Sequence, residues 1–210
     1  MRIRPDSARI PTIRRALIRL HTDLFAIDKR APWWISSEPL SPVEKMILIL
    51  EDRRFFFHSG FDLRSGLREL LRAITVQPHG GASTIDMQLV RTATGFREKT
   101  MRRKAYEILL AMLIQYRYNK LQILRIYLGC AFFGSHLLGI QKISRRIYGK
   151  EPSDLSIDEA AEVAAMLVYP RPLLPTPEWW AKLTRRANYA RALYPRLEKS
   201  FDKLPSWKMF

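Results

Sequence analysis

The sequence predicts an all-α domain, and three observations lead to this class. Apolar residues recur at spacings of three and four, as at Val43, Met46, Ile47 and Leu50, which is the pattern of a helix with one face on a core. The run SIDE, which begins at Ser156, is a capping box of the kind that opens a helix. No segment of useful length alternates apolar and polar residues as a strand does. With 210 residues, the chain suffices for one domain of ordinary size.

Eight helices follow from this periodicity and from the breaks between its runs. We expect them at about residues 12–30, 41–57, 62–75, 84–94, 98–118, 120–129, 156–167 and 178–200. Proline-rich segments near Pro32 and over Pro170–Pro177 separate neighbouring helices. The expected organisation is a basic amphipathic segment over 1–32, the main domain over 33–195 and a basic tail over 196–210.

The chain is strongly basic, with 36 Lys and Arg against 20 Asp and Glu and a formal net charge of +16. This charge favours an anionic partner such as nucleic acid, phospholipid or a phosphorylated ligand. Cys130 is the only cysteine, so no internal disulfide can form, and the four histidines lack metal-site spacing. Apolar runs such as Met46–Leu50 are far shorter than the ~18 residues of a membrane-spanning helix, and no secretory signal is expected.

The most informative segment begins at Glu51 and reads EDRRFFFHSG. On a helix, Glu51, Phe55 and His58 would share one face, because they stand at i, i+4 and i+7. Glu51 lies where the apolar stripe before it meets the polar one, so we expect a partly desolvated carboxylate. Such a carboxylate can serve as a general base. An amphipathic helix that ends in a charged turn is the alternative interpretation.

A second segment reads GGASTIDMQLVR and begins at position 80. Its paired glycines permit a turn with positive φ, and Ser83 with Asp86 has the spacing of an N-terminal cap. A glycine turn before a helix exposes backbone N–H groups, which suits an anion. Thr84, Gln88 and Arg91 then lie on one helix face. A capped surface helix would explain the glycines and Ser83 equally well, but it does not explain this polar stripe.

A third segment, RRKAYE, places Arg103 and Glu107 at i and i+4. A surface salt bridge, worth a few tenths of a kcal/mol, is the ordinary interpretation. Leu110 and Ile114 continue the same face, however, so Glu107 is expected to point toward the apolar interior. A buried carboxylate with Arg103 and Lys104 one turn away would form a binding site.

These three segments together resemble the peptidoglycan glycosyltransferases, which comprise monofunctional enzymes and the polymerase domain of bifunctional penicillin-binding proteins. The first family motif, Glu-Asp-x-x-Phe-x-x-His-x-Gly, is met in full. The second and third, Gly-x-Ser-Thr-Ile-Thr-Gln-Gln-Leu-x-Lys-Asn and Arg-Lys-x-x-Glu, are met at Gly81, Ser83, Thr84, Ile85, Gln88, Leu89, Arg103, Lys104 and Glu107, with Arg91 in the lysine place. The fourth, Lys-x-x-Ile-Leu-Glu-x-Tyr-Leu-Asn, is met in part at Ile123, Leu124, Tyr127 and Leu128. The resemblance covers about residues 33–195.

The sequence also departs from these motifs at five positions. Asp86 and Met87 replace a threonine and a glutamine of the second motif, and Thr92 replaces its asparagine. Arg125 replaces the glutamate of the fourth motif and Gly129 its asparagine. Asp86 is explained if it is a cap partner, whereas Arg125 inverts a charge and suggests a changed salt-bridge network or a shifted ligand preference.

The resemblance implies a lysozyme-like helical glycosyltransferase domain with a small second lobe. It implies that lipid II is polymerised onto polyprenyl-diphosphate-linked glycan, giving β-1,4 strands and free polyprenyl diphosphate. Glu51 and Glu107 become the candidate catalytic residues. The candidate substrate-binding residues are Asp52, Phe55, His58, Ser83, Thr84, Gln88, Arg91, Arg103 and Lys104.

The residues suit this chemistry. An acceptor hydroxyl must lose a proton as it attacks the anomeric carbon, and Glu51 is the candidate base. The diphosphate leaving group needs charge stabilisation, which Arg91, Arg103 and Lys104 would supply. A divalent metal such as Mg²⁺ or Mn²⁺ near Glu107 is a further expectation, and no other cofactor is expected.

By resemblance, the protein works at the external face of the bacterial inner membrane, although we expect this chain to lack the family's usual amino-terminal anchor. Its expected partners are lipid II, polyprenyl-diphosphate-linked glycan and an anionic membrane surface. The helix at 12–30 offers surface attachment, because apolar side chains and arginines line it and Trp33–Trp34 follow. Its apolar stripe consists of Ile13, Leu17, Leu20 and Leu24, with Phe25 beside it. The alternative is that this stripe packs on the protein's own core.

Three other functions compete with polymerisation. A lysozyme-like glycan hydrolase also uses two carboxylates, but it has no need of cations beside the second. A catalytically weak module that binds lipid diphosphates or glycan is favoured by Arg125 and Gly129. Nucleic-acid binding is suggested by charge alone, with no reading motif, and is not expected.

Overall fold

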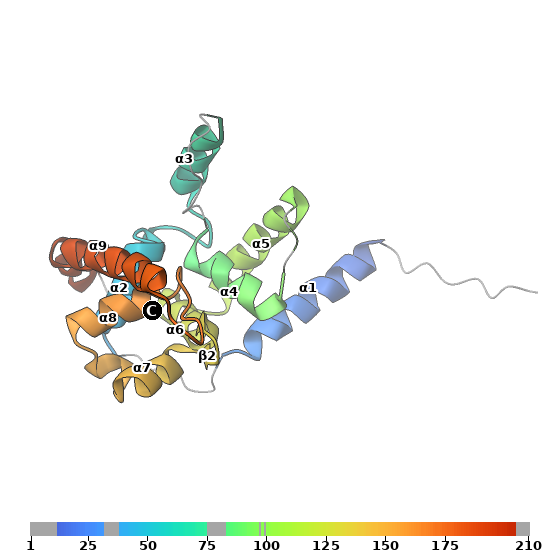
Figure 1. Cartoon of the computed structure of the whole chain (residues 1–210). Helices are drawn as coiled ribbons and strands as arrows, with labels where there is room; N and C mark the ends of the chain where they lie inside the picture. The colour runs from blue at the N-terminus through green and yellow to red at the C-terminus, as the bar shows by residue number, and fades with distance from the viewer. Residues whose placement is uncertain (1–11, 32–37, 75–82, 97, 99, 205–210) are drawn as a thin grey trace, which may run out of the picture.

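The computed structural model describes residues 12–31, 38–74, 83–96, 98 and 100–204. These residues form helices and one short hairpin, so the all-α class is confirmed (Figure 1). The helices are α1 (Thr12–Asp28), α2 (Pro42–Glu51), α3 (Leu63–Ile74), α4 (Ile85–Thr94), α5 (Met101–Leu113), α6 (Lys120–Cys130), α7 (Ile140–Tyr148), α8 (Ile157–Ala165) and α9 (Pro177–Asp202). Strands β1 (Phe132–Gly134) and β2 (Leu137–Leu138) pair antiparallel between α6 and α7. Short 3₁₀ turns cover Phe55–Phe57, Ile114–Tyr116 and Pro152–Asp154.

Side-chain caps fix where several helices begin. The predicted capping box at Ser156 is confirmed at the start of α8, and matching boxes open α2 at Ser41 and α6 at Asn119. In each box a side chain accepts a bond from a backbone N–H that the helix itself cannot satisfy. A cap of this kind contributes about 1 kcal/mol to helix stability.

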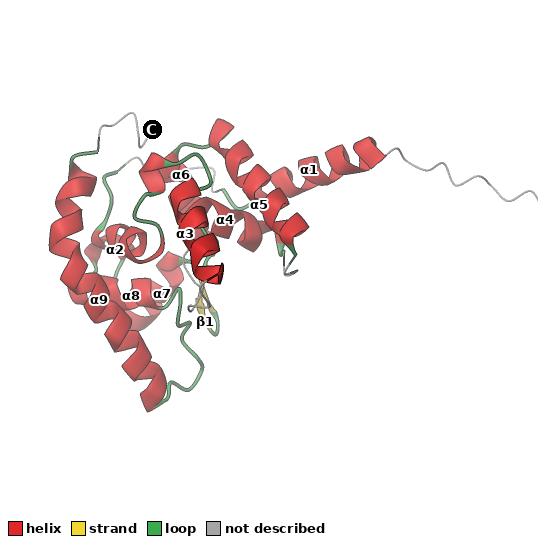
Figure 2. Ribbon diagram, turned by 90° about the horizontal axis from the view of Figure 1, so that it is seen from above, coloured by secondary structure: helices red, strands yellow, loops and turns green. Residues whose placement is uncertain are grey.

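Two groups of helices share the core. Helix α2 packs on α8 and α9, while α4 packs on α1, α5 and α6. Figure 2 shows the first group on the left and α1, α4 and α5 on the right. Val43, Met46 and Ile47 of α2 are fully buried, as the spacing of the apolar residues predicts.

The predicted helix over 41–57 is wrong beyond Glu51, where α2 ends. Asp52 leaves the helical conformation, and its side chain accepts a hydrogen bond from the backbone N–H of Ile85 at 3.1 Å. A turn and the 3₁₀ segment Phe55–Phe57 follow. Glu51, Phe55 and His58 therefore do not share one helix face.

Helix α1 is half docked and half projecting. Its stripe is partly buried at Leu20 and Leu24 and fully buried at Ile27, but Ile13 and Leu17 are 75% and 59% exposed. The C-terminal half therefore packs on the core, while the same stripe continues into solvent. Among the described residues, no helix is long and apolar enough to span a membrane. The expectations for Trp33–Trp34 and for the glycines at 80 and 81 fall outside the described residues.

Polar contacts hold the docked half of α1 in place. Asp23 accepts a hydrogen bond from the Tyr106 hydroxyl at 2.9 Å. Asp28 accepts bonds from the Tyr118 hydroxyl and the Arg117 guanidinium, both at 2.7 Å. These contacts fix the C-terminal half of α1 against α5 and the turn that follows α5.

Candidate active site

Glu51 stands at the end of α2 and is held by side chains from two other helices. Gln88 of α4 donates to its Oε2 at 3.2 Å, and Arg186 of α9 donates to its Oε1 at 2.8 Å. The Tyr127 hydroxyl of α6 in turn donates to the side-chain oxygen Oε1 of Gln88 at 2.6 Å, which orients the Gln88 amide. The Glu51 side chain remains 13% exposed, so a substrate atom can still reach its carboxylate.

Asp52, His58 and Thr84 join the turn after α2 to the start of α4. Asp52 pairs with Nε2 of His58 at 3.0 Å and meets the N-terminus of α4, where free N–H groups favour a negative charge. The Thr84 hydroxyl donates to the Gly60 carbonyl at 2.7 Å and accepts from Met87 N as the N-cap. Asp52 and Thr84 therefore both link the turn after α2 to the start of α4, and His58 pairs with Asp52.

Gly60 ends the first motif because the backbone there requires glycine. Its φ is +89°, and a Cβ at this position would lie 2.4 Å from the carbonyl oxygen of Ala111 on α5. The turn after α2 can press against α5 only without a side chain at this point.

Asp86 is a buried ion-pair partner, and its predicted role as a cap partner of Ser83 is wrong. Both of its oxygens lie 3.1 Å from Nζ of Lys120, and the Gln115 amide also donates to it. Burial raises the pKa of Asp86, and Lys120 opposes this rise. Burial likewise lowers the pKa of Lys120, whose ammonium also lies 4.4 Å from the centre of the Phe55 ring. Each charge of this pair is therefore buried against its opposite.

Glu107 is fully buried and faces three cations. Arg103 donates directly to Oε2, while Nζ of Lys104 and Nη2 of Arg91 lie 3.5 Å and 3.6 Å from Oε1. Lys104 also donates to the Ser83 hydroxyl at 3.1 Å, and burial lowers its pKa. The predicted inward orientation of Glu107 is confirmed. Three cations against one carboxylate leave about two positive charges for an incoming anion.

The expected metal near Glu107 does not fit this arrangement, because protein cations already face both of its oxygens. Among the described residues, one other group could hold an ion: Asp52, His58 and Asp86 place ligand atoms within 4.8 Å of one another. Lys120 contacts both oxygens of Asp86 and would compete with a metal there.

Helix α4 connects the two carboxylates. Gln88 contacts Glu51 and Arg91 contacts Glu107, and these two residues are neighbours at i and i+3 on one face. They are about 4.5 Å apart along the helix axis. The predicted polar face of this helix therefore lies between the possible base and the basic cluster.

Arg125 lies away from this face. Its guanidinium bonds to both oxygens of Glu44, at 2.8 Å and 3.2 Å, and so ties α6 to the first turn of α2. Glu44 is seven residues before Glu51, about 10 Å along the helix. The inverted charge thus belongs to a changed salt-bridge network, as one interpretation predicted. Nothing in the structure explains Gly129.

Three residues that contribute to the site were not among the candidate site residues from the sequence. Arg186 is one of many arginines on α9, and only its contact with Glu51 distinguishes it. Tyr127 belongs to the fourth motif, but its bond to Gln88 depends on how α6 packs on α4. Lys120 occupies the lysine place of that motif, which could have identified it.

Comparison with known proteins identifies relatives of this chain. The transglycosylase family model matches residues 23–193. Penicillin-binding protein 2a of Streptococcus pneumoniae serotype 2 is 35% identical over 61% of this chain and 17% of its own length. A biosynthetic peptidoglycan transglycosylase of Haemophilus influenzae is 33% identical over 67% of this chain and 57% of its length. Penicillin-binding protein 1A of Rickettsia felis is 32% identical over 80% of this chain and 22% of its length.

The family match spans most of the chain, so this protein belongs to the transglycosylase family. The chain spans less than two thirds of each of these three relatives, with 57% as the largest share.

Proposed function

We propose that this protein is a peptidoglycan glycosyltransferase that polymerises lipid II into β-1,4 glycan strands and releases polyprenyl diphosphate. The observation that carries the proposal is the polar face of α4. It connects a reachable carboxylate, Glu51, to a cation cluster around Glu107 through Gln88 and Arg91. A base beside a diphosphate-binding cluster is what transfer from a lipid diphosphate requires.

In the proposed reaction, Glu51 takes the proton of the acceptor hydroxyl while that oxygen attacks the anomeric carbon of the donor. Arg186 and Gln88 hold the Glu51 carboxylate in one orientation, so little reorganisation is needed at the moment of transfer. The bond from the anomeric carbon to the diphosphate oxygen breaks as the new glycosidic bond forms. Attack from the opposite side inverts the α-linked donor to a β-linked product.

The leaving diphosphate departs with its electron pair and needs charge stabilisation more than protonation. Arg91, Arg103 and Lys104 supply this charge, and Arg91 is the most accessible of the three, with 41% of its side chain exposed. Glu107 holds the three cations together against their mutual repulsion. No metal step is needed in this scheme, because the cluster already carries the compensating charge.

The surroundings of Glu107 argue against a glycan hydrolase. A two-carboxylate hydrolase needs a second acid or base that faces the scissile bond. Glu107 has no exposed surface, and its oxygens are engaged by three cations. It is therefore better suited to organise charge than to exchange a proton.

Turnover of labelled lipid II by the intact protein tests the proposal. Long glycan together with released polyprenyl diphosphate is the expected result. Shortening of added glycan would indicate a hydrolase instead. Retention of lipid II without any product would leave a binding module.

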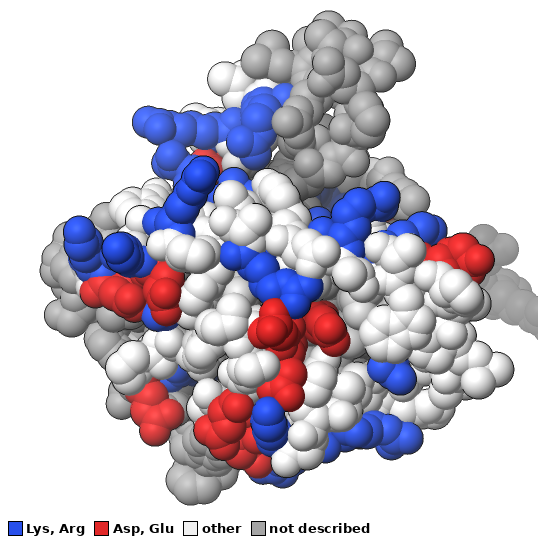
Figure 3. All heavy atoms as spheres, turned by 60° about the vertical axis from the view of Figure 1, so that its left-hand side comes forward, with Lys and Arg blue, Asp and Glu red and all other residues white. Residues whose placement is uncertain are grey.

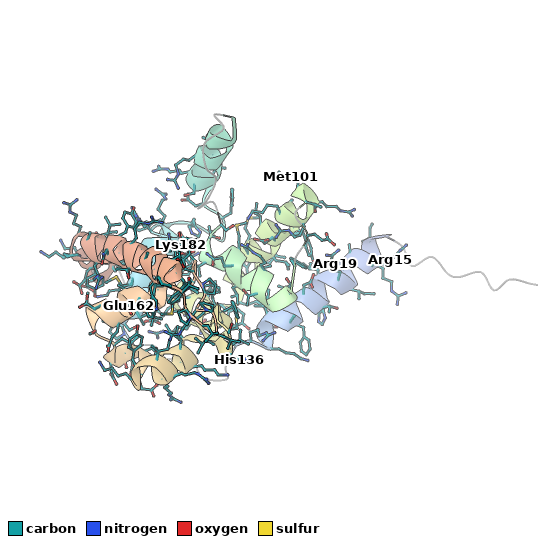
Figure 4. The ribbon with its side chains drawn as sticks, viewed as in Figure 1. Arg15, Arg19, Met101, His136, Glu162 and Lys182 are labelled. Atoms are coloured by element: carbon teal, nitrogen blue, oxygen red, sulfur yellow. The ribbon has the colours of Figure 1, made fainter. Side chains whose placement is uncertain are left out.

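We further propose that the projecting half of α1 attaches the protein to an anionic membrane surface, where the lipid tail of the substrate resides. Ile13 and Leu17 are exposed there, and Figure 4 shows Arg15 on the same half of the helix. Arg19 follows where the docked half begins, and its guanidinium lies 5.1 Å from the centre of the Tyr106 ring. Burying an apolar side chain of this size contributes about 1.5–3 kcal/mol, and each Arg near an anionic surface adds about 1 kcal/mol.

Binding to vesicles of mixed phosphatidylglycerol and phosphatidylcholine tests this attachment. Ile13→Gln combined with Leu17→Gln should weaken binding by tenfold or more and leave the unfolding temperature unchanged. Leu174→Gln, at a side chain that is 85% exposed elsewhere, is the matched control and should bind as the unmodified protein does. Deleting residues 1–30 should instead destabilise the fold, because it removes the buried Ile27. Unaltered vesicle binding by the double variant would exclude α1 as the anchor.

A further inference from the structure

A second cluster of cations lies outside the candidate active site, around a cavity of about 320 Å³. The cavity is formed by the β1–β2 hairpin, the end of α7 and the segment that follows α8. Its lining includes Arg146 of α7, Arg171 of that segment and Ser135 of the hairpin turn. Leu173 lies at its edge and is 70% exposed.

Arg171 is held rigidly at this cavity. Its backbone N–H donates to the Phe133 carbonyl at 2.8 Å, and its carbonyl accepts from Ser135 N at 2.9 Å. Gly134 permits this close approach, because a Cβ there would lie 2.3 Å from the Arg171 carbonyl oxygen. The Arg171 guanidinium lies 5.6 Å from the centre of the Trp180 ring. Its position is therefore set before any ligand arrives, which lowers the entropic cost of binding.

The side-chain polar groups of the cavity have no hydrogen-bond or carboxylate partner among the residues that the structure describes. Within the described part of the chain, neither the Arg146 nor the Arg171 guanidinium has a carboxylate within 4.0 Å, and the Ser135 hydroxyl makes no hydrogen bond. Glu162, which lies on α8 (Figure 4), accepts instead from the Tyr148 hydroxyl at 2.8 Å. Two guanidinium groups and a hydroxyl therefore remain available to an anion.

Helix α9 relates this cavity to Glu51. The Arg171 guanidinium lies 6.0 Å from the ring centre of Trp179, and Arg186 contacts Glu51. Trp179 and Arg186 are seven residues apart, so they share one face of α9 and lie about 10 Å apart along its axis. Two residues on one face of α9 therefore contact the two places, Trp179 at the arginine of the cavity and Arg186 at Glu51. Figure 3 shows that basic side chains also gather elsewhere, at the top of that view.

We propose that this cavity is a subsite for a carboxylate of the peptide that lipid II and the nascent glycan carry. The inference rests on the proposed function and deepens it by assigning the recognition of a second anionic group. Planar guanidinium groups bind carboxylates through paired hydrogen bonds, and Ser135 supplies a further donor. The diphosphate occupies the Glu107 cluster, so the two anions of one substrate have separate sites.

Equilibrium binding of soluble probes tests the subsite. The probes are a disaccharide–peptide fragment with free peptide carboxylates, the same fragment with those carboxylates amidated, and inorganic pyrophosphate. The unmodified protein should bind the free acid about tenfold more tightly than the amide. Arg146→Gln and Arg171→Gln should each remove most of that preference and leave pyrophosphate binding unchanged.

Arg145→Gln is the matched control, because Arg145 lies on the same turn of α7 but pairs with Glu151 at 2.7 Å. It should keep the full preference for the free acid. Arg171→Gln retains the backbone bonds to the hairpin, and an unchanged unfolding temperature will verify this. Equal binding of acid and amide, or a loss of pyrophosphate binding in Arg171→Gln, would overturn the proposal. The assay needs no turnover, so absence of polymer from lipid II would refute the proposed function and leave this result intact.

Discussion

Glu51 and Glu107 are both glutamates that contact the polar face of α4, the first through Gln88 and the second through Arg91. Their surroundings nevertheless differ. Glu51 has one cation, Arg186, and one amide donor, and 13% of its side chain is exposed. Glu107 has three cations and no exposed surface. The surroundings of Glu51 suit the proposed base, and those of Glu107 suit the proposed role of holding the cations in place. Environment rather than residue type therefore separates the two proposed roles.

The largest expected change in stability follows from removing the charge of Glu107. In Glu107→Gln, Arg103 and Lys104 lose their buried counter-charge and the three cations repel each other. Breaking a buried ion pair costs about 3–5 kcal/mol, so the free energy of unfolding should fall by about 3 kcal/mol or more. Denaturant titration measures this. Glu151→Gln, at an exposed pair, is the control and should leave the midpoint unchanged. An equally unchanged midpoint for Glu107→Gln would mean that the cluster does not depend on its carboxylate.

An intermediate effect is expected when the cations around Glu107 are removed singly. Arg91→Ala and Arg103→Ala should each weaken the binding of lipid diphosphates by about 1.5–3 kcal/mol, the value of one charge-assisted hydrogen bond. Binding of phosphate-free glycan should change far less. Titration with both ligands provides the comparison, and equal losses for both would show that the arginines only support the fold.

The smallest expected effect is a pH dependence that arises from Lys104. Burial lowers the pKa of this lysine below the usual 10.5, so it loses its charge at a lower pH than an exposed lysine does. Affinity for a diphosphate should therefore fall as the pH rises through the alkaline range below 10.5. Lys104→Arg should keep its affinity to higher pH, because arginine stays protonated. Identical pH profiles for the two proteins would contradict this role.

The sequence predicted best those features that depend on helical spacing alone. The spacing of Thr84, Gln88 and Arg91 predicts that they lie on one side of a helix, and the contacts of Gln88 and Arg91 agree with this. The burial of Glu107 followed from Leu110 and Ile114 one and two turns later, and all three are fully buried. Periodicity carries this information because a helix fixes the direction of each side chain.

Features that depend on distant contacts were predicted incorrectly or missed. Helix α2 ends at Glu51 because the Asp52 side chain bonds to Ile85, which is 33 positions away. The cap of α4 is Thr84 rather than Ser83, and the Ser83 hydroxyl instead accepts a hydrogen bond from Lys104. Local propensity cannot show which neighbour a polar side chain will meet, so tertiary contacts override it.

The polymerisation rate of Glu51→Gln tests the central claim most directly. The amide keeps the shape of the side chain but cannot take a proton, so the rate on labelled lipid II should fall by at least about 100-fold. The unfolding temperature should stay nearly unchanged, because Arg186 is 26% exposed and can turn to water. A folded variant that retains more than about 1% of the unmodified rate would contradict the assignment of Glu51 as the base.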